Sequence, residues 1–214
     1  IRYIYMNNLV VIHIGKCGGS TVCKELKNKN IKYSEIHVAN AKYQPDKKYV
    51  IVIRNPRDRF ISAFNWRYHL VCHTKLQEDR FSNEKNILRK YRNVDNLCSD
   101  LKKNPNIFNG TKRSGHYVHH LKEDIHFYLK KFIDKCPKKQ ILGVICTETL
   151  DNDMQRIFNI NVKIHAKKNK KYSNTISQAS NEILMKYLKK DYFIIEQMYK
   201  YNWISQEQYK FLKL

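Results

Sequence analysis

The sequence predicts an α/β fold in which helices flank a central, mostly parallel sheet. Three short apolar runs rich in β-branched residues, at positions 9–14, 49–53 and 141–146, have the length and composition of buried strands. Each run is followed by a segment with helical features, and strands that alternate with helices are typical of parallel sheets. With 214 residues the chain can form one substantial core, so we expect a single domain over residues 1–214.

Helices are expected directly after each predicted strand. The first strand ends at a glycine-containing turn, and a helix is predicted over residues 20–28 with Ser20 or Thr21 near its N-cap. Proline suits the first turn of a helix, so the second helix is predicted to begin at Pro56 and to extend through residue 64 or as far as 69. A third helix is predicted near residues 152–158.

The remaining segments have weaker patterns. Residues 74–112 are charged and rich in Asn and Lys, which predicts a helical insertion or a loop region over the sheet edge. Apolar residues recur at helical spacing over 116–133 and again over 180–198, so each segment is predicted to be an amphipathic helix. No run of eighteen apolar residues occurs, and no membrane span is expected in this chain.

The formal net charge of +22 has two interpretations. One is a compositional bias toward Lys, Asn, Ile and Tyr throughout the chain. The other is a polyanionic partner such as a nucleotide, a nucleic acid or an acidic glycan. Much of the lysine excess fits the first interpretation because it is spread along the chain, whereas the denser run at 167–171 is a candidate for anion contact.

Cysteine and histidine spacing gives no metal signature. The six cysteines form no C-x-x-C pair, which excludes zinc-ribbon and redox motifs, and their even number leaves disulfides open. The pairs His69/His73 and His116/His120 have helical i, i+4 spacing, but no carboxylate or cysteine completes a metal-binding pattern. We therefore expect no metal cofactor.

The turn after the first strand is a candidate anion site. Its sequence GKCGG, residues 15–19, leads into a helix, and glycines at such a position let backbone N–H groups and the helix N-terminus face a phosphate. Lys16 precedes Gly18 and Gly19, so the Walker pattern, with lysine after the last glycine, is not met. Strand, glycine turn and helix together make the expected three-layer fold P-loop-like.

Two motifs carry a family resemblance. H-I-G-K-C-G-G-S-T, residues 13–21, resembles the 5′-phosphosulfate loop of sulfotransferases that use 3′-phosphoadenosine 5′-phosphosulfate (PAPS), in particular the heparan sulfate 6-O-sulfotransferases. I-R-N-P-R-D-R-F-I-S-A-F, residues 53–64, resembles the 3′-phosphate motif of the same family. Each motif lies at the end of a predicted strand, and the two motifs follow one another along the chain in the order typical of the family. Residues 114–117 and the Lys/Asn-rich stretch before the last helices resemble the family layout more faintly.

The resemblance implies roles for individual residues in binding PAPS. Lys16 would contact the bridging oxygen and the 5′-phosphate, and the other residues of the loop, Cys17, Gly18, Gly19, Ser20 and Thr21, would cradle that phosphate. Arg54 and Ser62 would hold the 3′-phosphate; an ion pair between Arg54 and Asp58 is the alternative. Tyr117 and Lys168 are further candidates for nucleotide contact. Cys17 and Ser20 stand where the family often has threonine, and a bond between Cys17 and Cys23 is open.

The resemblance also implies a catalytic base. His37 lies between the two motifs, where the heparan sulfate 2-O- and 6-O-sulfotransferases carry a histidine that takes the acceptor proton, and an imidazole suits that role near neutral pH. Glu35 is the alternative base or an acceptor contact, and His13 is expected to be a packing residue at the strand end. Arg67 and His69 are candidate acceptor contacts, with surface roles equally open.

The expected reaction is an in-line transfer of a sulfuryl group to a hydroxyl, with Lys16 and loop amides stabilising the leaving phosphate and no metal required. The acceptor is expected to be a sugar hydroxyl, on an acidic polysaccharide or another glycan, and nucleic acid is not expected as a partner. The alternatives are a phosphoryl-transferring P-loop kinase and a non-enzymatic basic module that binds glycans or nucleic acid. The resemblance implies the Golgi lumen if an N-terminal anchor has been removed, and the cytoplasm otherwise.

Overall fold

The computed structural model describes residues 8–108, 110–113, 115–163 and 172–213. Its described part divides into two compact units. Unit 1 comprises Ile1–Asn55, Ile125–Lys168 and Tyr192–Leu214, and unit 2 comprises Pro56–Asp124 and Asn169–Asp191, without the residues outside the described ranges.

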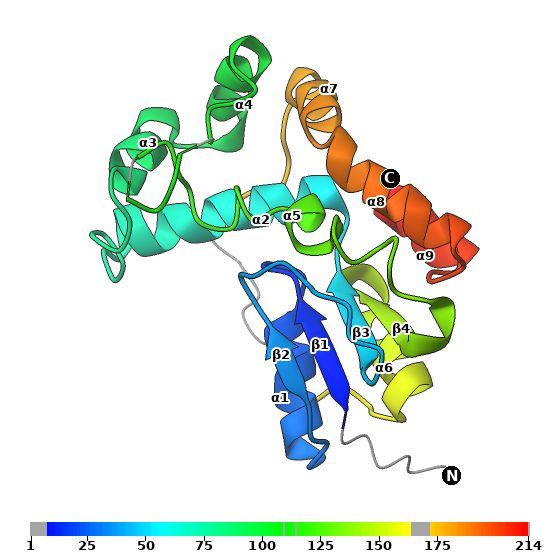
Figure 1. Ribbon diagram of the computed structural model, residues 1–214. Coiled ribbons are helices and arrows are strands. Elements are labelled where there is room, and N and C mark those ends of the chain that lie inside the picture. The colour runs from blue at the N-terminus through cyan, green and yellow to red at the C-terminus, as the bar shows by residue number, and fades with distance from the viewer. Residues whose placement is uncertain (1–7, 109, 114, 164–171, 214) are drawn as a thin grey trace. The chain divides into compact units, whose positions relative to one another are not determined.

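Unit 1 has the predicted α/β architecture. Four strands form an all-parallel sheet in the order β2-β1-β3-β4 (Figure 1). They are β1 (Leu9–His13), β2 (Ser34–Ile36), β3 (Lys48–Ile53) and β4 (Ile141–Cys146). All five residues of β1 are buried, which requires cover on both faces of the sheet. The fold class predicted from the sequence is therefore confirmed.

The helices of unit 1 follow the strands closely. α1 (Gly19–Asn28) comes after β1 and α6 (Leu150–Phe158) after β4, and both lie behind the sheet in Figure 1. The short α5 (Ile125–Leu129), the 3-10 turns Lys138–Gln140 and Thr147–Thr149, and α9 (Gln206–Lys213) complete the unit, with most of α8 (Lys189–Lys200). The helix predicted over 20–28 is confirmed with its start one residue earlier.

Unit 2 is helical in the described residues. It contains α2 (Pro56–Tyr68), the π-helical turn His69–His73, α3 (Glu84–Tyr91), α4 (Val94–Lys103) and α7 (Gln178–Tyr187). The helix that was predicted to begin at Pro56 is confirmed, and the charged region 74–112 contains α3 and α4. Arg59 is fully buried on α2 and donates to the backbone carbonyl of His120 at 2.7 Å.

Two helix predictions were too long. The segment predicted as a helix over 116–133 is helical only at Ile125–Leu129. His116 and His120 have φ angles of 52° and 66°, which an α-helix does not allow, so that pair does not share a helix face. The predicted helix over 180–198 is broken at Leu188 into α7 and α8.

No helix within the described residues is both long enough and apolar enough to cross a membrane.

Candidate functional site

The candidate site lies where the parallel strands of unit 1 end. Because all strands run the same way, their carboxyl ends share one edge, and the glycine loop (residues 15–19), His37 and Arg54 follow β1, β2 and β3 there. The chain adds β2 on one side of β1 and then β3 on the other. In open α/β sheets, ligands bind at the edge where the strand order reverses in this way, here between β1 and β3.

Backbone geometry shapes the glycine loop into an anion cradle. Lys16 and Gly18 have left-handed φ angles of 70° and 81°, and the N–H of Cys17 donates to the carbonyl of Ile14 at 3.3 Å. The N–H groups of Gly19 and Ser20 belong to the first turn of α1, where no preceding turn can accept from them. Together with the positive end of the helix dipole, these N–H groups favour a bound anion.

The two adjacent glycines serve different purposes. Gly18 occupies a left-handed conformation that side chains with a Cβ rarely adopt. Gly19 instead leaves room for the imidazole of His13, because a Cβ on Gly19 would lie 2.5 Å from Nε2 of that ring and nearer still to Cδ2. The loop backbone is thus packed directly on the last residue of β1.

The side chains of the loop point to different surroundings. Cys17 is fully buried and Thr21 is 4% exposed, whereas Ser20 is exposed and Lys16 is half-buried. Cys17 therefore contributes backbone to the cradle while its thiol lies in the core, where Sγ donates to the carbonyl of Gly15. All six cysteines are free thiols, so the bond between Cys17 and Cys23 that the sequence left open is not formed.

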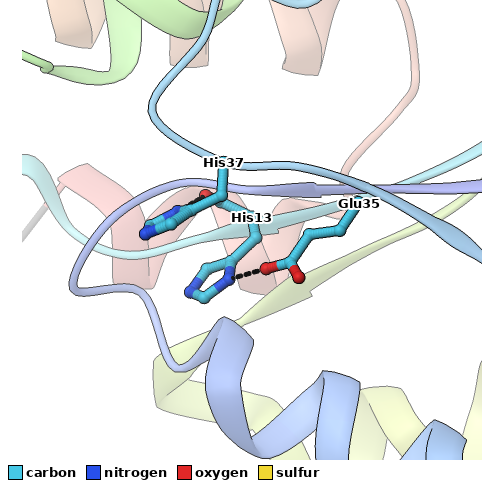
Figure 2. Close-up of side chains that lie close together, drawn as sticks. All are labelled: His13, Glu35 and His37. Atoms are coloured by element: carbon cyan, nitrogen blue, oxygen red, sulfur yellow. Dashed lines mark hydrogen bonds and ion pairs between the residues drawn. The ribbon is translucent and has the colours of Figure 1, made fainter.

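A histidine–glutamate cluster (His13, Glu35 and His37) stands next to this loop (Figure 2). It forms because β1 and β2 run in parallel with Val11 opposite Glu35, which brings the ends of the two strands together. Nδ1 of His13 and the carboxylate of Glu35 are hydrogen-bonded. The rings of His13 and His37 stack, with their centroids 4.2 Å apart and their planes 20° apart.

Hydrogen-bond partners fix how each imidazole presents its nitrogens. Nδ1 of His37 lies 2.8 Å from the backbone carbonyl of His13, and a carbonyl can only accept, so Nδ1 of His37 carries the hydrogen. In the neutral ring the lone pair is then on Nε2. The His37 side chain is exposed, whereas His13 is only 7% exposed. His37 is therefore the histidine of the cluster that a substrate can approach.

Arg54 lies one residue beyond β3 and its Nε is buried without a hydrogen-bond partner in the part of the chain that the structure describes. A buried guanidinium nitrogen without an acceptor is costly unless an anion satisfies it.

Hydrogen bonds fix the backbone that follows Arg54. Glu148, after β4, accepts from the N–H of Asn55 at 3.0 Å, and the Asn55 side chain donates to carbonyls of α9. Asp58 is paired with Arg57.

Four further predicted site residues lie in unit 2: Ser62, Arg67, His69 and Tyr117. Ser62 and His69 are half-buried, and Nδ1 of His69 lies 3.4 Å from the hydroxyl of Tyr172. Arg67 is 1% exposed, and its Nε donates to Glu84 at 2.9 Å, so its guanidinium is engaged inside the unit and does not face solvent. Lys168 lies outside the described residues.

Tyr117 is also part of the interior of unit 2. It is 2% exposed and donates to Glu123 at 2.6 Å. Burial and this hydrogen bond raise the pKa of Tyr117 far above its usual range. In this state the phenol contacts protein groups, and its assignment to the nucleotide stays a prediction.

Two groups of side chains among the described residues have metal-ligand chemistry. One is the histidine–glutamate cluster, and the other is His119, His120 and Glu123, which are all buried. In both groups the carboxylate already accepts hydrogen bonds, from His13 in the first and from Tyr117 and the N–H of His120 in the second. In each group, hydrogen bonds therefore already hold the carboxylate in place.

His13 is the packing residue at the end of β1 that the sequence predicted, but sequence reasoning missed its hydrogen bond to Glu35. The signal that would have found it is the pairing of residues 34–36 with β1, which sets Glu35 beside the end of that strand. The segment 34–36 was not predicted as a strand because Ser-Glu-Ile has no apolar run.

No family model matches the chain, and neither the curated proteins nor the solved structures contain a match to it.

Proposed function

We propose that this chain is a sulfotransferase that transfers the sulfuryl group of PAPS to a hydroxyl group, with a carbohydrate as the acceptor. The observation that carries the proposal is the placement of an anion-binding loop, an approachable imidazole and an unsatisfied arginine at the ends of β1, β2 and β3. The two sequence motifs described above resemble those of PAPS-dependent sulfotransferases, and all three features lie in unit 1.

The donor end of the proposal rests on the glycine loop and Arg54. The first-turn N–H groups of α1 and the charge of Lys16 suit the 5′-phosphate, since an anion at a helix N-terminus is stabilised by both. Arg54 suits the 3′-phosphate, because a phosphate oxygen would supply the acceptor that its buried Nε lacks. Ser62 keeps its predicted role at that phosphate on the strength of the motif alone.

The proposed chemistry is a direct displacement at sulfur. The acceptor oxygen forms a bond to sulfur while the bond between sulfur and the 5′-phosphate oxygen breaks. The proton of the acceptor hydroxyl passes to Nε2 of His37, and the charge that develops on the departing phosphate is stabilised by Lys16 and the N–H groups of the loop. Positioning and electrostatics suffice for this step.

The charge of the chain favours an acidic acceptor. A net charge of +22 attracts polyanions and raises their encounter rate at low salt. Among hydroxyl-bearing polymers, an acidic polysaccharide combines the required nucleophile with that charge, and we therefore propose a sugar hydroxyl on such a glycan.

Calorimetric titration tests the donor assignment. Adenosine 3′,5′-bisphosphate is expected to bind more tightly than ADP, and Arg54→Ala is expected to remove this preference because it removes the 3′-phosphate contact. Lys16→Ala should weaken both nucleotides. Lys24→Ala, an exposed lysine of α1, is the matched control and should bind as the unmodified chain does. Equal affinity for the two nucleotides, or binding of neither, would overturn the proposal.

A further inference from the structure

The carboxylate of Glu35 has a hydrogen-bond partner within the protein in addition to its contact with solvent. It is hydrogen-bonded to Nδ1 of His13 (Figure 2), although its side chain is 38% exposed. A carboxylate accepts, so Nδ1 of His13 donates and carries the hydrogen. The sequence assigned Glu35 to the acceptor or to an alternative base, and this contact suggests a different task.

His13 is enclosed on the sides where a substrate would approach. Gly19 leaves no space for even a methyl group above its ring, and the ring of His37 stacks on it at 4.2 Å. His13 therefore has little room to take part in the reaction itself. Its backbone carbonyl, however, accepts the hydrogen of His37 Nδ1.

We propose that Glu35 is a positioning residue, which acts through the His13 ring to hold His37 in the orientation that a base requires. This inference rests on the proposed function. The chain of contacts runs from the carboxylate to the His13 ring, from that ring by stacking to His37, and from the His13 carbonyl to His37 Nδ1.

The geometry gives the carboxylate a second effect on the reaction. The ligand atoms of the three residues lie within 4.8 Å of one another, so the Glu35 carboxylate is close to a ring nitrogen of His37. When His37 accepts the proton of the acceptor hydroxyl, it becomes an imidazolium. At this distance a negative charge attracts that imidazolium, and the attraction exists only after proton transfer has begun.

The Glu35 carboxylate has a second neighbour besides His13. The carboxylate lies near the thiol of Cys23, and burial together with the charge of Glu35 raises the pKa of Cys23 to about 11. Tyr33 donates to the carbonyl of Cys23 at 3.1 Å.

Three substitutions of Glu35 separate orientation from charge. Glu35→Ala removes both the acceptor for His13 and the charge, Glu35→Gln keeps an acceptor without the charge, and Glu35→Asp keeps the charge at a shorter reach. A general base contributes roughly 10²–10⁴-fold to a rate, so we expect kcat to fall about 10-fold or more for Glu35→Ala and less for the other two. KM and the affinity for adenosine 3′,5′-bisphosphate should stay near those of the unmodified chain. Glu207→Gln, an exposed residue of α9, is the matched control.

Imidazole ¹⁵N NMR spectra report the tautomer of each histidine directly and do not depend on enzymatic turnover. In the unmodified chain His13 and His37 are both expected as Nδ1–H tautomers, and Glu35→Ala should give a mixture of tautomers at His13 and a changed His37 signal. A kcat unchanged by Glu35→Ala, or an Nε2–H tautomer at His13, would overturn the inference. Absence of nucleotide preference with the expected tautomers would instead refute the proposed sulfotransferase and leave the contact chain established.

Discussion

The close packing of Gly19 on His13 makes Gly19→Ala the sharpest test of the site. The new methyl group would lie 2.5 Å from Nε2 of His13 and closer to two other ring atoms, whereas ordinary contact begins at 3.4 Å. The ring must therefore retreat by about 1 Å or more. Such a shift disturbs the hydrogen bond to Glu35 and the stacking on His37, which occupy the other sides of the ring.

The expected cost has two parts. Overpacking a tight interior costs about 1–3 kcal/mol in the free energy of unfolding. In a domain of this size each kcal/mol lowers Tm by about 2–4 °C, so a decrease of roughly 2–12 °C is expected. The rate of the proposed sulfuryl transfer should fall by about 100-fold, because a misplacement of about 1 Å at a reacting group can cost that much in rate.

Gly143→Ala is the matched control for overpacking. Gly143 lies in β4, and a Cβ there would meet the side chain of Ile157, with Cγ1 at 2.7 Å. This variant should lose stability but keep turnover per folded molecule, since its clash involves neither the glycine loop nor the histidine–glutamate cluster. Melting by circular dichroism and kcat measured on the folded fraction compare the two. Equal kcat in both variants, or a Gly19→Ala protein with the Tm and His13 tautomer of the unmodified chain, would refute the reasoning.

Two further predictions concern unit 2. Glu84→Gln should lower the free energy of unfolding by about 3–5 kcal/mol, because it leaves the buried Arg67 without its charged partner; urea unfolding measures this, and a change below about 1 kcal/mol would contradict it. Burial alone would raise the pKa of Glu123, but hydrogen bonds from His119, Tyr117 and the N–H of His120 lower it from 4.5 to about 2. Because this pKa is depressed in the folded state, its contribution to stability is present above pH 4.5 and is lost as the pH falls toward 2. Glu123→Gln should flatten the stability profile in that window, and a profile parallel to that of the unmodified chain would contradict the assignment.

The strongly patterned elements of the fold could be predicted from the sequence. β1, β3 and β4 are continuous apolar runs that can only be buried, and Pro56 marks the start of α2 where its ring is tolerated. Helical spacing over 116–133 was misleading. There the chain turns at residues with positive φ, and tertiary contacts such as that of Glu84 with the N–H of His119 hold it in place.

Part of the candidate site could also be predicted, because it has a strong local sequence pattern. A glycine loop after a buried strand is a local pattern, so its position could be predicted from the sequence. The contact of His13 with Glu35 depends on which strand pairs with β1 and in what register, and no local pattern encodes that pairing. The burial of Arg67 likewise depends on Glu84, seventeen residues further along the chain.

The position of β2 has a consequence for how His37, the proposed base, is held in place. β2 has three residues, and among the described strands it lies at the sheet edge with only β1 beside it. So short a ladder anchors a segment weakly, and local opening of such an edge is a low-energy event. The hydrogen bond between the His13 and Glu35 side chains therefore also helps to hold β2 against β1. If Glu35→Ala removes this hydrogen bond, amide hydrogen exchange should quicken at residues 34–38 before it does in β3, and His37, the proposed base, would then project from a frayed edge.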